Sequence, residues 1–170
     1  MTELMKIYTF PDPVLREIAQ TIEEINDEIQ DLIDRMAATM YAAPGIGLAA
    51  NQVGVTKRLI VFDLNTDTDE QKLNVLINPE IISSEGEYTY EEACLSVIDF
   101  SAEVKRKGRI HVRGLDRDGN SIDIEAEGLG AICLQHEIDH LNGVLFIDHI
   151  SSLKRALYKK KLKKIMQNKE

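Results

Sequence analysis

The sequence predicts an α+β fold built as a single domain. Its 170 residues are enough for one hydrophobic core. With 44% hydrophobic and 29% charged residues, the composition is that of an ordinary globular protein and excludes a disordered or membrane-embedded one. Segments with strand character follow one another between residues 58 and 127, and helical segments come after them. An α/β fold would instead alternate the two kinds of element.

Two helices are expected in the first third of the chain. Residues 12–19 predict a short helix with Pro13 near its start, where the missing N–H of proline is tolerated. Residues 26–43 predict a longer helix, because acids occupy its first turn and apolar residues recur at helical spacing. These apolar residues are Ile29, Leu32, Ile33, Met36 and Met40, and the run Ala42-Ala43-Pro44-Gly45 ends the helix.

Strands are expected in the middle of the chain. The candidate segments are residues 58–63, 73–77, 81–83 and 94–100. Two further strands, residues 104–115 and 121–127, are predicted to pair as a hairpin. The turn residues Asp116-Arg117-Asp118-Gly119-Asn120 separate them.

The last part of the chain predicts two helices. Residues 129–142 form the first, and Gly143 lies just past its end, where a helix C-cap favours glycine. The second begins at Ser151 or Ser152 and has a partial apolar face. Leu153, Leu157, Leu162, Ile165 and Met166 make up that face.

Charge is distributed unevenly along the chain. Residues 154–170 contain eight Lys or Arg and one acid, whereas residues 1–153 contain 12 bases and 28 acids, which together give the net charge of −9. A basic tail suits an anionic surface such as ribosomal RNA, although such a run is also common on a solvated helix face.

Nothing in the sequence indicates export or a membrane. No apolar run reaches the roughly 20 residues needed to cross a bilayer. Residues 1–10 do not resemble a signal peptide. We therefore expect a cytoplasmic protein that binds neither membrane nor DNA, in which Cys94 and Cys133 do not form a disulfide.

The segment Gln135-His136-Glu137-Ile138-Asp139-His140 contains the pattern His-Glu-x-x-His. On a helix, residues four apart lie on one face, so His136 and His140 can bind one cation. Glu137 follows the first histidine, and its carboxylate can reach a water at the metal and act as a general base. The pattern therefore predicts a hydrolytic metal site; the alternative is a histidine pair on a polar helix face.

A catalytic metal site needs a third protein ligand and an open position. Zinc proteases often take that ligand from downstream, but Phe146 occupies the position of the third histidine of one large class. The only downstream glutamate is Glu170 in the basic tail, and His149 is a minor candidate. We therefore expect the third ligand to come from upstream.

Cys133 and Cys94 compete for that role. Cys133 lies seven residues before His140, which is about 10 Å along a helix axis. A short cysteine side chain cannot easily share one ion with both histidines from the same helix. Cys94 can approach on a strand from another direction, so we predict Cys94 as the ligand and Cys133 as a pocket or core residue.

The segment Gly45-Ile46-Gly47-Leu48-Ala49-Ala50-Asn51-Gln52 is also unusual. Its glycines permit close approach of another group to the backbone, and Gln52 carries an amide donor. The segment lacks the Lys-Ser/Thr ending of a phosphate-binding loop. The alternative interpretation is a tight turn with a buried alanine pair.

Together these three segments resemble peptide deformylases, enzymes that remove the N-formyl group from new polypeptides. That family carries a G-x-G-x-A-A-x-Q loop, an E-G-C-L-S strand and a Q-H-E-x-D-H-L-x-G helix. The first and third motifs are matched at every fixed position, and the second appears as Glu92-Ala93-Cys94-Leu95-Ser96. The resemblance runs from about Ile7 to Ile150.

The resemblance implies mostly antiparallel strands packed around a central metal-binding helix, with a helix at the C-terminus. Residues 1–150 would form the catalytic domain, and residues 151–170 a basic helix that is part of it or an appendage. One divalent ion would be bound, physiologically Fe(II), with Zn, Ni or Co able to substitute. The ligand set alone would have suggested zinc.

The resemblance also implies roles for individual residues. Cys94, His136 and His140 would bind the metal, and Glu137 would be the acid and base. Gln52 and the Leu95 N–H would face the carbonyl oxygen of an N-formylmethionyl nascent peptide. Gly45 and Gly47 would meet the peptide backbone, and Ile46, Leu129, Ile132 and Cys133 would line the methionine pocket.

This chain departs from the family pattern near Cys94. Ala93 replaces the usual glycine, and Ile98 and Ser101 stand where the family carries Pro and Arg. Two rival functions also remain open, a metallopeptidase and a non-catalytic protein with a structural metal. As in bacterial members with a basic C-terminal helix, the tail would dock on the ribosome.

Overall fold

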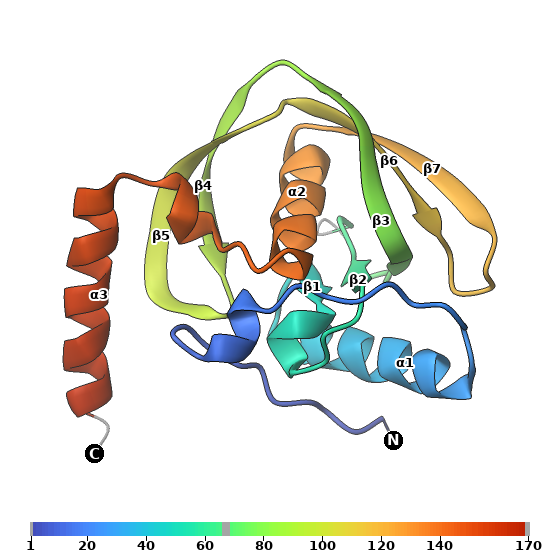
Figure 1. Cartoon of the computed structure of the whole chain (residues 1–170), viewed down its shortest axis with the longest axis horizontal. Coiled ribbons are helices and arrows are strands. Elements are labelled where there is room, and N and C mark those ends of the chain that lie inside the picture. Colours follow the sequence, from blue (N-terminus) through green and yellow to red (C-terminus); the bar gives the residue numbers. More distant parts are fainter. Residues whose placement is uncertain (1, 66–68, 169–170) are drawn as a thin grey trace.

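In the computed structural model, which describes residues 2–65 and 69–168, two antiparallel sheets enclose one helix (Figure 1). The α-helices and strands are α1 (Asp27–Ala42), β1 (Gly47–Ala49), β2 (Leu59–Phe62), β3 (Asn74–Glu85), β4 (Tyr88–Cys94), β5 (Val97–Arg106), β6 (Arg109–Leu115), β7 (Ser121–Glu127), α2 (Leu129–Leu141) and α3 (Ser152–Gln167). Single 3-10 turns are η1 (Pro13–Arg16), η2 (Ala50–Val53) and η3 (Phe146–His149).

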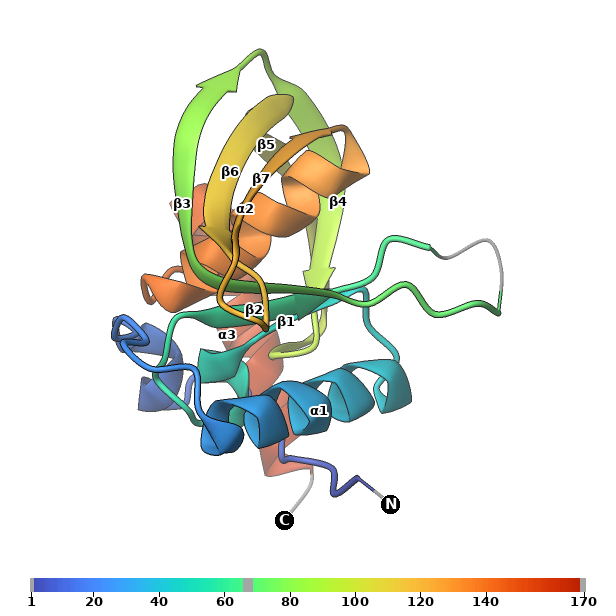
Figure 2. The same ribbon diagram turned by 90° about the vertical axis from the view of Figure 1, so that its right-hand side faces the viewer.

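The larger sheet has five strands in the order β1-β2-β3-β6-β7, and β4 pairs with β5 in a separate two-stranded sheet. Both views show α2 between the β4–β5 hairpin and the larger sheet (Figures 1 and 2). All these strand pairs are antiparallel. The structure therefore confirms the predicted α+β class, with a central helix and antiparallel strands around it.

Helix α1 forms where the sequence predicts it. The Asn26 side chain caps its first turn by accepting a hydrogen bond from the Ile29 N–H at 3.0 Å, and Asp27 and Glu28 follow. Its apolar face is buried in a hydrophobic cluster with residues of β1 and β2 such as Leu48 and Val61. The expected helix over residues 12–19 is shorter than predicted, because only η1 is helical and Glu17 is already extended.

Two predicted strand boundaries are wrong. Residues 74–77 and 81–83 belong to one strand, β3, because Pro79 lies at a register shift where a missing N–H is tolerated, and Leu73 lies just before this strand. Residues 104–115 are not one strand, since the chain turns between β5 and β6.

The expected strand over residues 94–100 also contains a turn. The chain reverses after Cys94 and pairs Cys94 with Val97. β4 was not predicted, because most of its side chains are exposed and show no apolar alternation. The hairpin of β6 and β7 is confirmed.

Ten of the 13 residues of α2 are buried, so its polar side chains must find partners inside the protein. The helix ends at Leu141, and Gly143 lies just past its end as predicted, with φ +75°. A side chain there would also clash, since an added Cβ would lie 2.5 Å from the Arg16 carbonyl oxygen. Both facts require glycine at this position.

Helix α3 lies at one side of the molecule (Figure 1). Ser151 caps it by accepting a hydrogen bond from the Lys154 N–H at 3.2 Å. The predicted apolar face is largely wrong, since Leu153, Leu157 and Met166 are exposed. Leu162 is buried as predicted, and the other buried residue is Tyr158; both join a cluster that contains Phe10, Phe100 and Phe146. Within the described residues, no helix combines the length and apolarity needed to cross a membrane.

Candidate metal centre

Three potential metal-binding side chains converge from two elements. His136 and His140 lie one turn apart on α2, and Cys94 stands at the end of β4. The His140 Nε2 atom lies 3.2 Å from His136 Nε2 and 3.3 Å from the Cys94 Sγ. One donor atom from each of the three lies within 4.8 Å of the other two. The structure therefore brings together the three residues that the sequence predicts as ligands.

These distances fit a single ion. Typical bonds of about 2.0–2.1 Å to nitrogen and 2.3 Å to sulfur place tetrahedral ligands roughly 3.3–3.6 Å apart. The observed separations of 3.2 and 3.3 Å are close to these values. Two imidazoles and a thiolate form a donor set suited to Zn, Fe, Co or Ni.

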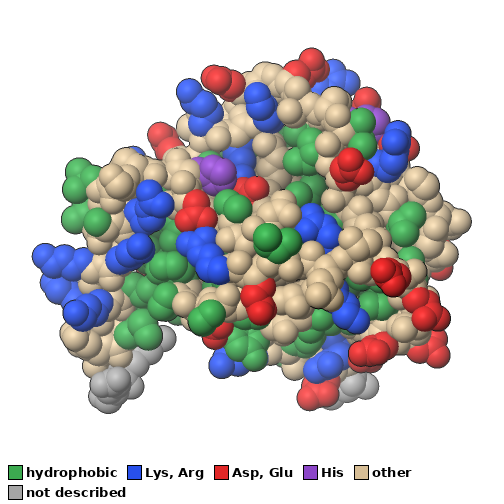
Figure 3. Space-filling model, viewed as in Figure 1, with side chains coloured by type: hydrophobic (Ala, Val, Ile, Leu, Met, Phe, Trp, Pro, Cys, Tyr) green, Lys and Arg blue, Asp and Glu red, His purple; other side chains and the backbone are tan. Residues whose placement is uncertain are grey.

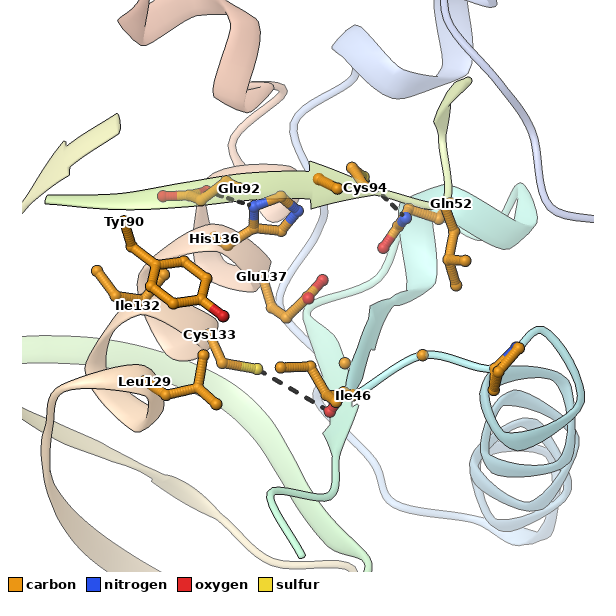
Figure 4. Close-up of a pocket in the computed structure, with 15 residues that line it drawn as sticks. Ile46, Gln52, Tyr90, Glu92, Cys94, Leu129, Ile132, Cys133, His136 and Glu137 are labelled. Atoms are coloured by element: carbon orange, nitrogen blue, oxygen red, sulfur yellow. Dashed lines mark hydrogen bonds and ion pairs between the residues drawn. The ribbon is translucent and has the colours of Figure 1, made fainter. Parts of the chain in front are cut away.

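His136 is held by a buried carboxylate that the sequence analysis missed. Its Nδ1 atom lies 2.9 Å from the Oε1 of Glu92, and Glu92 receives two further hydrogen bonds from Arg106 at 2.7 and 2.9 Å. The contact with Glu92 orients the ring, so that Nε2 faces Cys94 and His140. Figure 4 shows Glu92 and His136 joined in this way. Glu92 is the first residue of the Glu92–Ser96 motif, and its place there is the sequence signal that could have pointed to it.

Arg106 is also buried and bridges two acids. It donates to Glu92 and, at 2.6 Å, to Asp139 on α2. Burial alone would raise the pKa of Glu92, but hydrogen bonds from Arg106 and His136 outweigh it and lower that pKa. Glu92 is therefore a charged carboxylate that can accept a hydrogen bond from the Nδ1–H of the His136 ring.

The pKa values of His136 and His140 are shifted in opposite directions. Burial lowers the pKa of His140, and the neighbouring His136 lowers it further. For His136, burial acts in the same direction, but its hydrogen bonds to Cys94 and Glu92 outweigh this and raise the pKa. A bound cation would displace protons from such a cluster, so metal binding and proton release are coupled here.

Glu137 lies in the same cavity without a hydrogen-bond partner for its Oε1 atom among the described residues. Burial raises its pKa to about 7. The carboxylate closely approaches β1, because a Cβ added to Gly47 would lie 2.5 Å from Glu137 Oε2. Glycine at position 47 thus makes room for this side chain.

Gln52 is fixed beside Cys94. Its Oε1 accepts a hydrogen bond from the Ala49 N–H at 3.0 Å. Its Nε2 donates to the Ser96 hydroxyl at 3.0 Å and lies 3.6 Å from the Cys94 Sγ. Ser96, which the sequence analysis did not single out, therefore helps to orient the amide.

A cavity of about 300 Å³ opens next to these groups (Figure 4). It is lined by every residue predicted to bind substrate, together with Gln52, Leu95, Glu137, Cys94 and His136. The lining residues that the sequence analysis did not assign to the substrate are Pro44, Tyr90, Glu92 and Ala93. The predicted substrate-binding residues in the lining are Gly45, Ile46, Gly47, Leu129, Ile132 and Cys133.

Cys133 lies on the wall of this cavity and outside the group of converging donors. Its Sγ is 4.0 Å from the Ile46 carbonyl oxygen, and burial raises the pKa of the thiol well above its usual value. His149, the minor candidate, instead lies 2.9 Å from Asp139. Of the departures from the family pattern, Ala93 lines the cavity, whereas Ser101 donates to Glu91 at 3.1 Å.

Known proteins resemble this chain over nearly its full length. A family model described as polypeptide deformylase matches residues 4–156. The peptide deformylase of Thermodesulfovibrio yellowstonii is 58% identical over 160 residues, which cover 94% of this chain and 97% of the relative. That of Mesorhizobium japonicum is 53% identical over 160 residues, with coverages of 94% and 91%.

Solved structures agree with the sequence relatives. The peptide deformylase of Legionella pneumophila matches with a TM-score of 0.91 and 47% identity, covering 98% of both chains. That of Synechococcus elongatus, solved in complex with actinonin, matches with a TM-score of 0.87 and 40% identity, covering 94% of this chain and 86% of that one. On the strength of the family model, the identities and the shared fold, this chain belongs to the peptide deformylase family.

Proposed function

We propose that this protein removes the N-formyl group from the N-terminal methionine of newly made polypeptides and releases formate. The observation that carries the proposal is the position of Glu137. Its buried carboxylate shares one cavity with Cys94 and His136 and has an oxygen without a partner among the described residues. A carboxylate so placed can take a proton from an attacking water.

Cys94, His136 and His140 would hold one divalent cation, with Fe(II) as the native metal and Zn, Ni or Co as substitutes. When bound, the ion supplies Lewis-acid chemistry that activates water and polarises a carbonyl group. Glu92 would keep the His136 ring in the orientation that ligation needs, through its contact with Nδ1. Quantifying the metal after anaerobic purification tests which ion is native.

Glu137 would act twice in the reaction. It first takes the proton of the water that attacks the formyl carbon, and it later returns that proton to the leaving amine of methionine. Gln52 and the Leu95 N–H would stabilise the negative charge that develops on the formyl oxygen. Loss of one such donor typically costs about 10²–10³ in rate.

The remaining cavity residues suit a methionine side chain and the peptide behind it. Ile46, Leu129, Ile132 and Cys133 provide apolar walls, and Tyr90 adds an aromatic ring. β1, with Gly47, is an edge strand of the larger sheet, so its backbone is available to a peptide in extended conformation.

The variant Glu137→Gln tests the proposal. It keeps the size of the side chain, so it should retain the metal and lose nearly all turnover of formyl-Met-Ala. Glu125→Gln, on the exposed face of β7, serves as the control and should keep wild-type activity. An active Glu137→Gln enzyme would show that the assigned base is wrong.

A second assay separates deformylation from peptide cleavage. The protein should release formate from formyl-Met-Ala and leave unblocked Met-Ala intact. Cleavage of the Met-Ala bond would favour the metallopeptidase alternative. Bound metal with no activity on either peptide would favour a structural site.

The protein would work in the cytoplasm, and α3 would dock on the ribosome. Between Ser152 and Gln167 this helix has seven Lys or Arg and no acid. Basic side chains gather over it on the surface (Figure 3). Such a surface suits the phosphate backbone of RNA, with an affinity that falls as salt rises.

The docking proposal is best tested without truncating α3, because Tyr158 and Leu162 are part of the core. Replacing Lys159, Lys160, Lys163 and Lys164 by Gln removes exposed charges only. This variant should co-sediment less with ribosomes and keep its activity on short peptides. Unchanged co-sedimentation would contradict docking through α3.

A further inference from the structure

Asn51 is fully buried beside Gln52, but it does not line the substrate cavity. Its side-chain amide donates to the Glu17 carbonyl at 2.8 Å and to the His140 carbonyl at 2.9 Å. Both neighbours are acceptors, so only the NH₂ group of the amide can face them. The two N–H donors are therefore both used on the backbone.

The carbonyl of His140 belongs to the last turn of α2, where carbonyls have no partner within the helix. Gly143 N–H donates to it at 3.1 Å, and Asn51 supplies the second hydrogen bond. The Asn51 Oδ1 atom is buried without a partner among the described residues, which costs free energy. The side chain is thus committed to donation toward Glu17 and His140.

Gln52, the next residue along the chain, contacts the segment that carries the remaining predicted ligand, Cys94. Gln52 donates to Ser96 at 3.0 Å and lies 3.6 Å from the Cys94 Sγ. Asn51 and Gln52 are neighbours in the single turn η2. Asn51 in this turn therefore contacts α2 at His140, and Gln52 contacts the segment that contains Cys94 and Ser96.

We propose that Asn51 is a positioning residue that sets the place of His140 relative to Cys94. The inference rests on the proposed function, since it takes these residues as the metal ligands. In the loop motif G-x-G-x-A-A-x-Q, Asn51 occupies a position that is not fixed, so the family resemblance assigns it no role. Its action is indirect, through the backbone of a ligand rather than through the metal.

The test measures the affinity of the full-length protein for Co²⁺ by competition with a chelating dye, together with the visible spectrum of the cobalt-loaded protein. Asn51→Ala removes both hydrogen bonds and should weaken Co²⁺ binding about tenfold or more, the range found for residues that orient metal ligands. It should also shift the cobalt bands, because His140 moves.

Asn78→Ala is the matched control. Asn78 makes the same kind of bridge, donating to the Ile22 carbonyl at 2.9 Å and accepting from the Ile22 N–H at 2.9 Å. Its φ is +52°, so alanine there adds strain and the control is destabilised as well. This variant should lose thermal stability and keep the wild-type cobalt affinity and spectrum.

A purely structural role for Asn51 would lower the stability of the metal-free and metal-loaded forms equally and leave the affinity unchanged. Binding by Asn51→Ala within twofold of wild type, or an equal loss in Asn78→Ala, would overturn the inference. If Asn51→Ala does not fold, Asn51→Ser, which keeps one donor, is judged by the same criteria. A wild-type protein that binds no Co²⁺ would instead overturn the proposed metal centre itself.

Discussion

The two cysteines line one cavity in different surroundings. Cys94 lies 3.3 Å from His140, whereas Cys133 faces the Ile46 carbonyl and has a raised pKa through burial. A thiol that stays protonated is a poor ligand. We therefore expect Cys133→Ser to retain one metal ion per chain, measured by elemental analysis after dialysis.

Cys94→Ser is the counterpart of that experiment. It replaces the thiolate by a hydroxyl, a much weaker ligand, and should lose the metal under the same dialysis. Equal metal content in the two variants would contradict the assignment of Cys94. Loss of the metal from Cys133→Ser alone would exchange the roles of the two cysteines.

Gly47 offers a second prediction at the scale of one residue. The Cβ of Gly47→Ala would lie 2.5 Å from Glu137 Oε2 and 3.0 Å from Cys133 Sγ, so the carboxylate must move. A displacement near 1 Å in a catalytic group can cost about 100-fold in rate. We expect kcat for a formyl-Met peptide to fall by about that factor, with folding retained.

The control for Gly47→Ala is Gly86→Ala, between β3 and β4. An added Cβ there meets nothing within 4 Å, although its φ of +70° makes alanine strained. Gly86→Ala should therefore lose some stability and keep the wild-type kcat. A normal kcat in Gly47→Ala would mean that Glu137 does not need its observed position.

Among the elements, those with strong local signals were predicted correctly from the sequence. α2 has a clear motif and a terminal glycine, and the β6–β7 hairpin has a turn of Asp, Gly and Asn residues. The roles of the motif residues stay predictions, but the structure does gather Cys94, His136 and Glu137 around one cavity.

An element without an apolar pattern of its own was missed. β4 has mostly exposed side chains and is stabilised by its partner β5. Glu92 and Arg106 lie 14 residues apart and meet only because these two strands pair. No local pattern marks an arginine as buried, so the contribution of Arg106 to this support of His136 was not visible in the sequence.

The packing of α3 against the rest of the protein could not be predicted from its apolar pattern either. Tyr158 is 1% exposed, and its ring centroid lies 4.5 Å from that of Phe100. Tyr158→Ala would leave a large cavity under the helix. We expect it to lower the free energy of unfolding by about 3–5 kcal/mol, measured by urea denaturation.

Leu157→Ala is the matched control for Tyr158→Ala. Leu157 precedes Tyr158 but is 59% exposed, so its truncation should change the free energy of unfolding by no more than about 0.5 kcal/mol. A similar loss in both variants would contradict the inference that the packing of Tyr158 on Phe100 holds α3 in place, because alanine favours the helix at both positions.

At the scale of the whole molecule, the N-terminal segment forms hydrogen bonds with the backbone at the C-terminal end of α2. Arg16 in η1 donates to the Gly143 carbonyl at 3.1 Å and pairs with Asp148 at 2.6 and 3.0 Å. The Ala19 N–H donates to the Leu141 carbonyl at 2.8 Å. Residues far apart in the sequence thus converge where α2 ends. The ion pair between Arg16 and Asp148 should make the free energy of unfolding depend on pH.

The sign of that dependence follows from Asp148. Burial alone would raise its pKa, but hydrogen bonds from the Arg16 side chain and the Leu145 N–H outweigh it and hold the pKa below its usual value of 3.8. The folded state therefore binds this proton less readily than the unfolded chain. Its contribution to stability is present above about pH 4 and is lost as pH falls through the lowered pKa.

Asp148→Asn should consequently be less stable than wild type at pH 6, with a difference in unfolding free energy that shrinks toward pH 3. Asp118→Asn, in the exposed turn between β6 and β7, should follow the wild-type curve at both values. Urea denaturation at pH 6, 4.5 and 3 measures the three proteins. Protonation of Asp148 removes the negative charge that pairs with Arg16. A difference in unfolding free energy between Asp148→Asn and wild type that stays constant from pH 6 to pH 3 would therefore show that this ion pair does not cause the difference.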